Sequence, residues 1–162
     1  MDNKKNFELT TETRKMFGRT LFRIKALKSF NDVKVGDLGG FVEKEENLSE
    51  NAWVCDDARV YGNARVYGVV KICDAADLSN NNDYIYFKCL GSSLTFFKCK
   101  DGHIHVSWDD ISWDDNNFDR SLYAFEKEVK KLQNNKYDEY AKGYLPCIEI
   151  VKIHFGLTDD EV

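Results

Sequence analysis

The chain has 162 residues, of which 43% are hydrophobic and 14% aromatic, and its formal net charge is −5. A chain of this length and composition can bury one core, or two small cores that share an interface, so disorder is not expected. The charge is uneven, because residues 1–30 carry eight Lys and Arg against three acids, whereas residues 29–81 carry ten acids against five bases. A basic leader on an acidic body does not indicate a nucleic-acid-binding domain.

The cysteines and the apolar segments bear on the cellular compartment. Five cysteines occur without a CxxC motif, and they are Cys55, Cys73, Cys89, Cys99 and Cys147. No apolar run approaches the roughly 20 residues that span a membrane, and the N-terminal MDNKKNFELT lacks the apolar segment of a signal peptide. We therefore expect a reducing cytoplasm and free, mostly buried thiols, with one internal disulfide as the alternative.

Residues 1–41 are expected to form a basic leader and a capping strand. Between Arg19 and Lys28 apolar and polar side chains alternate, which predicts a strand. A short repeat unit leaves its ends open, and open strand ends pair with other segments of the chain. We therefore expect this strand to cover one end of the repeat that follows it.

Residues 42–81 follow a period of six. Branched aliphatic residues recur at every sixth position, and these are Val42, Leu48, Val54, Val60, Val66, Ile72 and Leu78. Smaller apolar residues precede the later ones by two positions, and these are Ala52, Ala58, Ala64, Val70 and Ala76. Neither the period of a helix nor that of a lone strand gives this pattern. The period is typical of a repeat that buries its apolar face only by stacking on its neighbours.

The segment NAWVCDDARVYGNARVYG (51–68), with the turn-formers Gly62-Asn63 between its aliphatics, resembles the hexapeptide repeat of left-handed parallel β-helices. In that family three rungs make one triangular coil, so the resemblance implies about two coils in residues 42–81. Residues eighteen apart then stack, and the implied pairs are Trp53 on Lys71, Cys55 on Cys73, Arg59 on Asp77 and Tyr61 on Ser79. We expect the two cysteines to act as small hydrophobic side chains rather than as a disulfide or a metal-ligand pair.

Residues 82–162 are predicted to form an α+β domain. Three aromatic-rich alternating segments, 84–90, 93–99 and 103–108, predict an antiparallel meander. Asp101-Gly102 is typical of a two-residue hairpin turn, which places Cys99 opposite Ile104 and on the other face from the two histidines of the hairpin. We therefore expect no zinc site from the set Cys89, Cys99, His103 and His105.

Two helices are predicted at the end of the chain. Asp119 can cap the first, whose apolar stripe consists of Leu122, Phe125, Val129 and Leu132. The second runs from Tyr137 to Phe155 and contains Pro146, which is expected to kink or restart it. The predicted fold class is therefore α+β: a short left-handed parallel β-helix of about two coils, followed by a small antiparallel meander and two C-terminal helices.

The order of these features over roughly residues 20–156, from LFRIKALKSFNDVKVGDLGG through the repeats to FFKCKDGHIHVS and YAKGYLPCIEIVKIHF, resembles a group of small proteins common in bacteriophages and prophages. Members couple a short hexapeptide-like coil to a small α+β tail, and most have no assigned activity. The resemblance implies a phage or mobile-element origin.

An enzyme is not expected. Hexapeptide acyltransferases use a histidine near the coil as general base, but the three histidines of this chain lie after the repeat, at His103, His105 and His154. No signature of a nucleophilic enzyme surrounds any of the five cysteines. We therefore expect no catalytic residue, no cofactor and no bound metal.

The segment SWDDISWDD (107–115) is the most unusual local feature. It predicts a partner-binding surface, because tryptophans anchor interfaces and carboxylates complement Arg- and Lys-rich partners. The residues assigned to it are Trp108, Asp109, Asp110, Trp113, Asp114 and Asp115. Two alternatives stay open: the carboxylates can hold a hard cation such as Ca²⁺, or the tryptophans can pack under the following helix while the aspartates are solvated.

The repeat predicts a second partner-binding surface. Arg59, Tyr61, Arg65 and Tyr67 follow one another at six-residue steps and are expected to project outward. Such side chains suit protein contacts, including the formation of a dimer or trimer. The alternative is that the two tyrosines pack against the N-terminal strand.

These features predict a non-enzymatic, phage-encoded binding protein that inhibits a host protein by occlusion in the host cytoplasm. The expected partner is a basic nucleic-acid-processing defence effector, such as one of CRISPR–Cas, which would make the chain an anti-CRISPR protein. Direct contact with nucleic acid or with a membrane is not expected. The alternatives are an acyl- or nucleotidyltransferase of the hexapeptide type and a small-molecule sponge that uses the groove between two coils.

Overall fold

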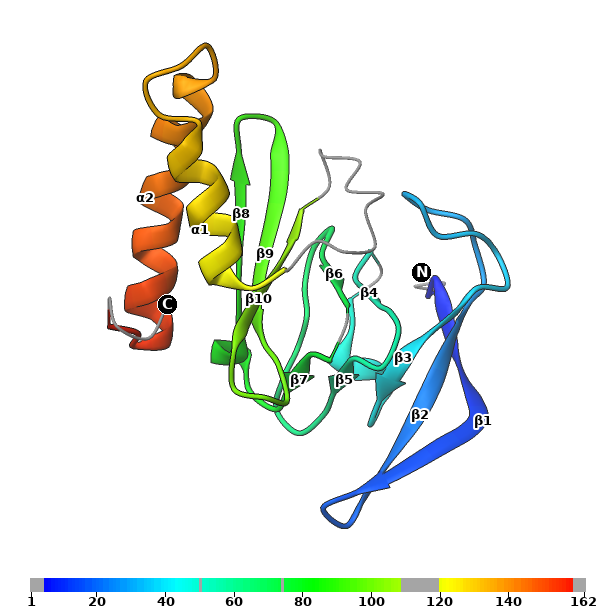
Figure 1. Ribbon diagram of the computed structural model, residues 1–162. Helices are drawn as coiled ribbons and strands as arrows, with labels where there is room; N and C mark the ends of the chain where they lie inside the picture. The colour runs from blue at the N-terminus through cyan, green and yellow to red at the C-terminus, as the bar shows by residue number, and fades with distance from the viewer. Residues whose placement is uncertain (1–4, 50, 74, 109–119, 159–162) are drawn as a thin grey trace. The chain divides into compact units, whose positions relative to one another are not determined.

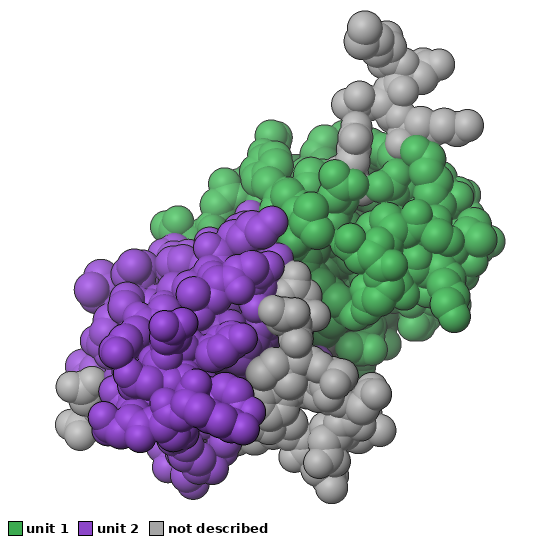
Figure 2. Space-filling view, turned by 90° about the horizontal axis from the view of Figure 1, so that it is seen from above, with its two compact units in different colours: residues 1–83 green, residues 84–162 purple. Residues whose placement is uncertain are grey.

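The structure is a computed structural model. The residues that it describes are 5–49, 51–73, 75–108 and 120–158. Helices and several sheets are mixed in it, which confirms the α+β class (Figure 1). The chain divides into two compact units, residues 1–83 and residues 84–162, which Figure 2 shows in different colours.

An antiparallel hairpin opens the first unit. Its strands are β1 (Phe7–Met16) and β2 (Arg19–Ala26). The predicted strand after Arg19 is thereby confirmed, whereas the sequence does not predict β1, because most of its side chains are exposed or half-buried and show no apolar alternation. Phe17 and Gly18 make the turn, and their φ angles of 49° and 75° are those that a two-residue hairpin requires.

Three further strands extend this hairpin into a five-stranded sheet of order β1-β2-β3-β5-β7. β3 (Leu38–Val42) pairs antiparallel with β2. β5 (Arg59–Val60) and β7 (Asp77–Leu78) then add in parallel. The N-terminal hairpin therefore covers the edge of β3 that the repeat leaves open (Figure 1). Two short 3-10 turns, η1 (Glu45–Asn47) and η2 (Asn81–Asp83), complete the unit.

The parallel pairs of the repeat join residues eighteen positions apart. Arg59 pairs with Asp77 in the five-stranded sheet. A separate two-stranded sheet joins β4 (Trp53–Val54) to β6 (Lys71–Ile72), so that Trp53 pairs with Lys71. These two predicted pairs are confirmed.

The aliphatic residues of the six-residue period form the core of the first unit. All seven are at most 5% exposed, and the smaller residues that precede them are equally buried. Burying one such aliphatic side chain stabilises the folded state by about 1.5 to 3 kcal/mol. The period therefore supplies the main stabilisation of a unit whose repeat strands are only two residues long.

Two glycines let β3 pass close to the repeat. A Cβ on Gly39 would lie 2.4 Å from the carbonyl oxygen of Val54, and a Cβ on Gly40 would lie 2.5 Å from that of Ala58. Both neighbours are backbone atoms, which cannot rotate away as a side chain can. Glycine is therefore required at these positions by the close approach of two backbone segments.

The prediction that Cys55 and Cys73 are two small hydrophobic side chains is wrong, because the two residues form a disulfide. The stacking that the repeat predicts is present, with a Cα–Cα distance of 4.7 Å. This distance lies within the usual range for a disulfide. The short backbone separation at this stacked pair, rather than the expected compartment, therefore decides the state of the two cysteines.

The second unit contains a three-stranded antiparallel sheet of order β10-β9-β8. Its strands are β8 (Tyr84–Cys89), β9 (Ser92–Lys98) and β10 (Ile104–Trp108). They confirm the predicted meander. Helices α1 (Leu122–Lys131) and α2 (Asp138–Phe155) lie side by side next to this sheet (Figure 1).

The ends and the interior of the two helices differ from the prediction in detail. The side chain of Ser121 caps α1 by accepting a hydrogen bond from the Ala124 N–H at 3.2 Å. The predicted cap, Asp119, lies outside the described residues. α2 does not restart at Pro146, because it continues to Phe155. Gly156 ends it in the left-handed conformation that commonly closes helices.

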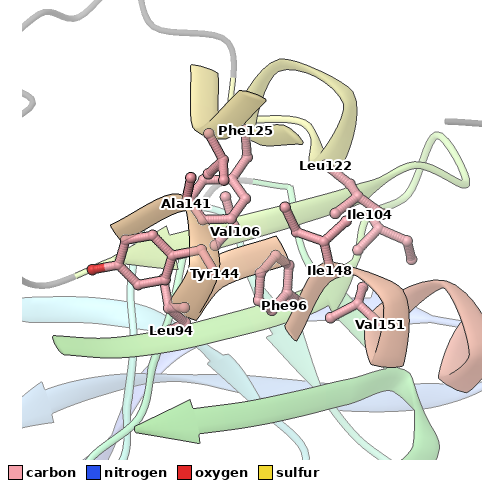
Figure 3. Packing of buried hydrophobic residues seen from close by; sticks show 11 residues of the cluster. Leu94, Phe96, Ile104, Val106, Leu122, Phe125, Ala141, Tyr144, Ile148 and Val151 are labelled. Carbon is pink, nitrogen blue, oxygen red and sulfur yellow. The ribbon is translucent and has the colours of Figure 1, made fainter. Parts of the chain in front are cut away.

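The core of the second unit lies between the sheet and the helices. Figure 3 shows Phe96 and Val106 of the sheet facing Phe125 of α1 and Tyr144 of α2. The rings of Phe96 and Phe125 pack edge to face with their centroids 5.6 Å apart. Alternate residues of β9 and β10 are therefore directed at the helices, which fixes the face on which the remaining residues lie.

The hairpin between β9 and β10 departs from its predicted register by one residue. The Cys99 N–H donates to the His103 carbonyl at 2.9 Å, and the Gly102 N–H donates to the Cys99 carbonyl at 3.0 Å. The loop therefore has three residues rather than two. Gly102 has a φ of 86°, as the last residue of such a loop requires.

This register changes which side chains share a face. Phe97 pairs with His105, and Lys98 pairs with Ile104. Because a shift of one residue moves every side chain to the other face, Cys99 lies on the same face as His103 and His105. The predicted opposition of Cys99 to the histidines, on which the exclusion of a zinc site depended, is wrong.

In the part of the chain that the structure describes, no helix is both long enough and apolar enough to cross a bilayer.

Candidate functional site

The tip of the β1–β2 hairpin carries an exposed aromatic side chain. Phe17 is 82% exposed, the largest exposed fraction among the large hydrophobic residues of the described chain. Its φ of 49° lies in the left-handed region, which is unusual for a bulky residue and which Asn or Gly adopts at lower cost. The hairpin thus holds an apolar ring in solvent on a backbone that favours smaller residues.

The first Arg/Tyr pair of the repeat is partly covered by the N-terminal hairpin. Arg59 is half-buried, and its Nη1 donates to the sulfur of Met16 at 2.9 Å. Tyr61 is also half-buried, and burial, followed by the nearby charge of Asp77, raises the pKa of its hydroxyl. For Arg59 the structure thus shows contact with the N-terminal strand in place of outward projection.

The second Arg/Tyr pair is exposed, as predicted. Arg65 projects into solvent, and a hydrogen bond with Tyr67 raises the pKa of its guanidinium. Tyr67 is 55% exposed and Val69 is 50% exposed. We call these three residues, Arg65, Tyr67 and Val69, the 65–69 edge.

Ion pairs join the basic N-terminal segment to the acidic repeat. They connect Lys5 to Glu45 at 2.5 Å, Arg14 to Asp57 at 2.8 Å and Arg19 to Glu43 at 2.8 Å. Exposed pairs of this kind contribute about 0 to 1 kcal/mol each. Their main consequence is that three basic side chains of the N-terminal segment lie against three acidic side chains of the repeat.

A shallow polar hollow of about 270 Å³ lies in the first unit. Its lining includes Arg19, Glu43, Tyr61, Gly62, Ser79 and Asn80. The Glu43 carboxylate accepts hydrogen bonds from the Gly62 N–H at 2.7 Å and from Arg19 at 2.8 Å. These bonds outweigh partial desolvation and lower the pKa of Glu43. The main charged groups of the hollow therefore already satisfy one another.

Trp108, the first residue of the predicted SWDDISWDD surface, packs into the core of the second unit. Its ring lies 5.2 Å from that of Phe125 and 4.9 Å from that of Tyr144, both edge to face. For this tryptophan the alternative of packing under the helix is therefore observed. The other residues assigned to this surface lie outside the described residues, and they are Asp109, Asp110, Trp113, Asp114 and Asp115.

The β9–β10 hairpin brings several metal-ligating side chains together. Ligand atoms of Cys99, Asp101 and His105 all lie within 4.8 Å of one another. His103 Nδ1 lies 3.2 Å from Asp101 Oδ2. Asp101 was not among the metal-ligating residues considered from the sequence, because Asp101-Gly102 was assigned to the turn alone, although an Asp between a Cys and two His is itself a signal.

The two remaining free cysteines, Cys89 and Cys147, lie close to one backbone carbonyl. Cys89 and Cys147 both donate to the Gly143 carbonyl, at 3.5 Å and 3.6 Å. Burial, followed by the neighbouring Cys89, raises the pKa of the Cys147 thiol to about 11. A thiol with such a pKa is protonated at neutral pH and is a poor nucleophile.

No protein-family model matches the chain, and no curated protein matches it either.

Proposed function

We propose that the chain is a non-enzymatic binding protein that inhibits a host protein by occluding its surface. The observation that carries this proposal is the exposure of Phe17 at the tip of the β1–β2 hairpin. Exposed aromatic side chains are the usual anchors of protein interfaces. A ring held in solvent contributes nothing to the folded state, so a binding role accounts for a residue that the turn itself disfavours.

The 65–69 edge provides a second contact of suitable chemistry. It combines one guanidinium, one phenol ring and one aliphatic side chain, all exposed. Arginine and tyrosine are enriched at the centres of interfaces, because they bury much area and still make hydrogen bonds. The carboxylates of SWDDISWDD would complement a basic groove of the partner.

The partner that we propose is a basic nucleic-acid-processing defence protein of the bacterial cytoplasm, so that the chain acts as a phage-encoded anti-defence factor such as an anti-CRISPR protein. This proposal takes its phage origin from the sequence resemblance. A homodimer or homotrimer formed through the repeat is compatible with it.

We also propose that residues 42–81 form about two coils of a left-handed parallel β-helix. The eighteen-residue pairing of Arg59 with Asp77, of Trp53 with Lys71 and of Leu48 with Val66 supports three rungs in each coil. A crystal structure in which the chain of residues 42–81 wound in the right-handed sense would contradict the assignment. So would a crystal structure that lacked these three residue pairs.

The experiment that tests the binding proposal is a pull-down from host lysate with quantitative mass spectrometry. Phe17→Asn removes the ring and places a residue that tolerates the left-handed backbone, so the variant is expected to fold and to lose partner capture. Leu90→Asn is the matched control, because Leu90 is also the exposed first residue of a turn of this kind, with a φ of 53° before Gly91.

The result of the pull-down shows whether the hairpin tip at Phe17 or the acidic segment 107–115 anchors the partner. If Phe17→Asn captures the same host protein as the wild type, the hairpin tip is not the anchor. A variant with the four aspartates 109, 110, 114 and 115 changed to Asn then tests the acidic segment. If neither variant changes capture or the biological effect, the occlusion proposal is wrong.

The polar hollow favours a second candidate function, the binding of a small molecule by a transferase-like or sponge-like protein. Its volume of about 270 Å³ suits a small polar molecule or one polar end of a larger ligand. Thermal unfolding with acetyl-CoA and with nucleotide sugars tests this candidate, because a ligand that binds the folded state raises the midpoint in a saturable manner. Native mass spectrometry of protein isolated from cells would show a retained ligand.

A further inference from the structure

We propose that the tip of the β9–β10 hairpin binds a zinc ion through Cys99, Asp101 and His105. Ligand atoms of these three side chains lie within 4.8 Å of one another. The set joins a thiol, an imidazole and a carboxylate, which are the three kinds of side chain that bind zinc in proteins. This inference is independent of the proposed binding function.

The backbone of the hairpin is what brings the three side chains together. The three-residue loop places Cys99 opposite His103, and β10 alternates its side chains, so His105 points to the same face as Cys99. Asp101 lies in the loop between the two strands. The three ligands therefore come from seven consecutive residues, which keeps the entropy needed to assemble the site small.

The separation of the ligand atoms is close to that of a filled site. Zinc lies about 2.3 Å from sulfur and about 2.0 to 2.2 Å from nitrogen or oxygen, so tetrahedral ligand atoms are about 3.3 to 3.8 Å apart. The limit of 4.8 Å exceeds this by about 1 Å. A small rotation of the exposed Asp101 side chain, which keeps its hydrogen bond from the His103 N–H, can close such a gap without moving the strands.

The donor set selects the class of metal. Calcium and magnesium prefer oxygen ligands, whereas thiolate and imidazole favour zinc. Cys99 is 5% exposed and His105 is half-buried, so two ligands lie away from bulk water. Asp101 is exposed and leaves one side of the ion open. Three protein ligands with an open fourth position are the arrangement found in zinc sites that keep a water or bind a further ligand.

His103 has a positioning role in this site. Its backbone N–H donates to Asp101 Oδ1 at 3.0 Å, and its Nδ1 lies 3.2 Å from Asp101 Oδ2. Both contacts orient the carboxylate from outside the ligand set. Outer residues of this kind tune the affinity of a site without contacting the metal.

A second group of possible ligands provides an internal control. Ligand atoms of Cys55, Asp56 and Cys73 are equally close to one another. The disulfide between the two cysteines leaves no thiolate there to bind a metal. Zinc binding by the oxidised protein therefore reports on the hairpin rather than on the repeat.

The test uses the full chain, isolated anaerobically without reductant so that the Cys55–Cys73 disulfide stays closed. The protein is stripped with a chelator and titrated with Zn²⁺ against a chromophoric competitor, and with Co²⁺ as a spectroscopic substitute. We expect one equivalent of Zn²⁺ and a thiolate-to-cobalt charge-transfer band in the near ultraviolet. Zinc is also expected to raise the midpoint of thermal unfolding.

Variants with matched controls assign the ligands. Cys99→Ser and His105→Gln are expected to lose the cobalt band or its intensity and to weaken zinc binding by at least about a hundredfold, and His103→Gln by about tenfold. Asp101→Asn is expected to weaken binding between these limits. The controls Cys147→Ser, His154→Gln and Asp138→Asn change the same residue types elsewhere in the second unit and are expected to bind as the wild type does.

Three results would overturn the proposal: no stoichiometric zinc binding by the wild type, unchanged binding by His105→Gln, or loss of binding in Cys147→Ser. Circular dichroism of the metal-free protein shows whether the Cys99→Ser variant folds. If it does not fold, zinc binding by His105→Gln tests His105 as a ligand, and the cobalt band of the wild type tests Cys99. A cobalt spectrum without a thiolate band would exclude Cys99 as a ligand.

Discussion

The guanidinium group of Arg14 lies over the ring of Phe41, with the Arg14 Cζ atom 4.1 Å from the ring centroid. Phe41 is fully buried, and Arg14 also pairs with Asp57 at 2.8 Å. One side chain of β1 therefore covers an aromatic ring of β3 and reaches an acid of the repeat. This contact adds a side-chain interaction to the backbone pairing that holds β1 against β2.

Replacing Arg14 by Ala is expected to lower the free energy of unfolding by about 1 to 2 kcal/mol, because a cation–π contact and an exposed ion pair are lost together. Urea denaturation measures the change. Lys15→Ala is the control, since Lys15 is exposed on the same strand, and its effect is expected to stay within about 0.5 kcal/mol. Equal effects of the two substitutions would show that the contact does not stabilise β1.

Reduction of the Cys55–Cys73 disulfide is expected to lower the free energy of unfolding by about 3 kcal/mol. The two cysteines are 18 positions apart, and a bond that closes a loop of this length restricts the unfolded chain by about that amount. Urea denaturation with and without reductant measures the difference. The variant with both residues changed to Ser should be as stable as the reduced protein and insensitive to reductant. Thiol titration of the unfolded, unreduced chain should give three thiols, those of Cys89, Cys99 and Cys147.

Gly40→Ala is expected to destabilise the first unit by about 2 to 3 kcal/mol, because the new Cβ would meet the Ala58 carbonyl oxygen and the backbone has to shift. Gly143→Ala is the comparison. Its Cβ would come within 2.5 Å of Leu90, but that neighbour is the end of a half-exposed side chain that can rotate. Alanine also favours the helix, so the net effect there is expected to be below about 1 kcal/mol. The midpoints of thermal unfolding check both values.

Lys152→Met is expected to destabilise the second unit by about 2 kcal/mol, because Glu126 would stay buried and keep only its exposed partner Lys130. Lys152 Nζ lies 3.0 Å from the Glu126 carboxylate, and both side chains are at most 10% exposed. Lys131→Met breaks an exposed pair with Glu128 on the same helix. That control is expected to cost less than about 1 kcal/mol.

The same ion pair predicts a pH dependence. Burial raises the pKa of Glu126, but hydrogen bonds from Lys130 and Lys152 outweigh it, so that the pKa lies below its ordinary value of 4.5. A lowered pKa in the folded state means that the stabilisation is present above pH 4.5 and is lost as the pH falls through the folded value. The stability difference between the wild type and Glu126→Gln should therefore shrink in urea titrations carried out below that pH. A constant difference would contradict the assignment.

Cys147 is expected to react with iodoacetamide far more slowly than a free cysteine at pH 8, because burial and the neighbouring Cys89 raise its pKa to about 11. Mass spectrometry of peptides after timed labelling measures the rate for each thiol. In urea the same residue should react at the rate of an ordinary thiol. Fast labelling of Cys147 in the folded protein would contradict both its burial and its raised pKa.

Much of the fold was predictable, because the spacing of apolar residues within a single segment of the chain indicates how that segment folds. The six-residue spacing from Val42 to Leu78 identified the buried side chains of the repeat and the eighteen-residue pairs. The alternation of 84–108 and the apolar stripe after Ser121 identified the meander and α1. Phe17 as a candidate site was not predictable, since its exposure depends on β1, a strand without an apolar pattern.

The six-residue period alone thus determined which side chains of the repeat are buried and which of its strands stack, because both follow from spacing along the chain. Only the tertiary structure decided two contacts: one depends on the exact length of a hairpin loop, and the other depends on the exact distance between two backbone segments. The loop from Lys100 to Gly102 suits a two-residue or a three-residue turn equally well, and the longer one moves Cys99 onto the face of His105. The stacked Cys55 and Cys73 join because their backbones lie close enough for a bond, a distance that spacing along the repeat cannot specify.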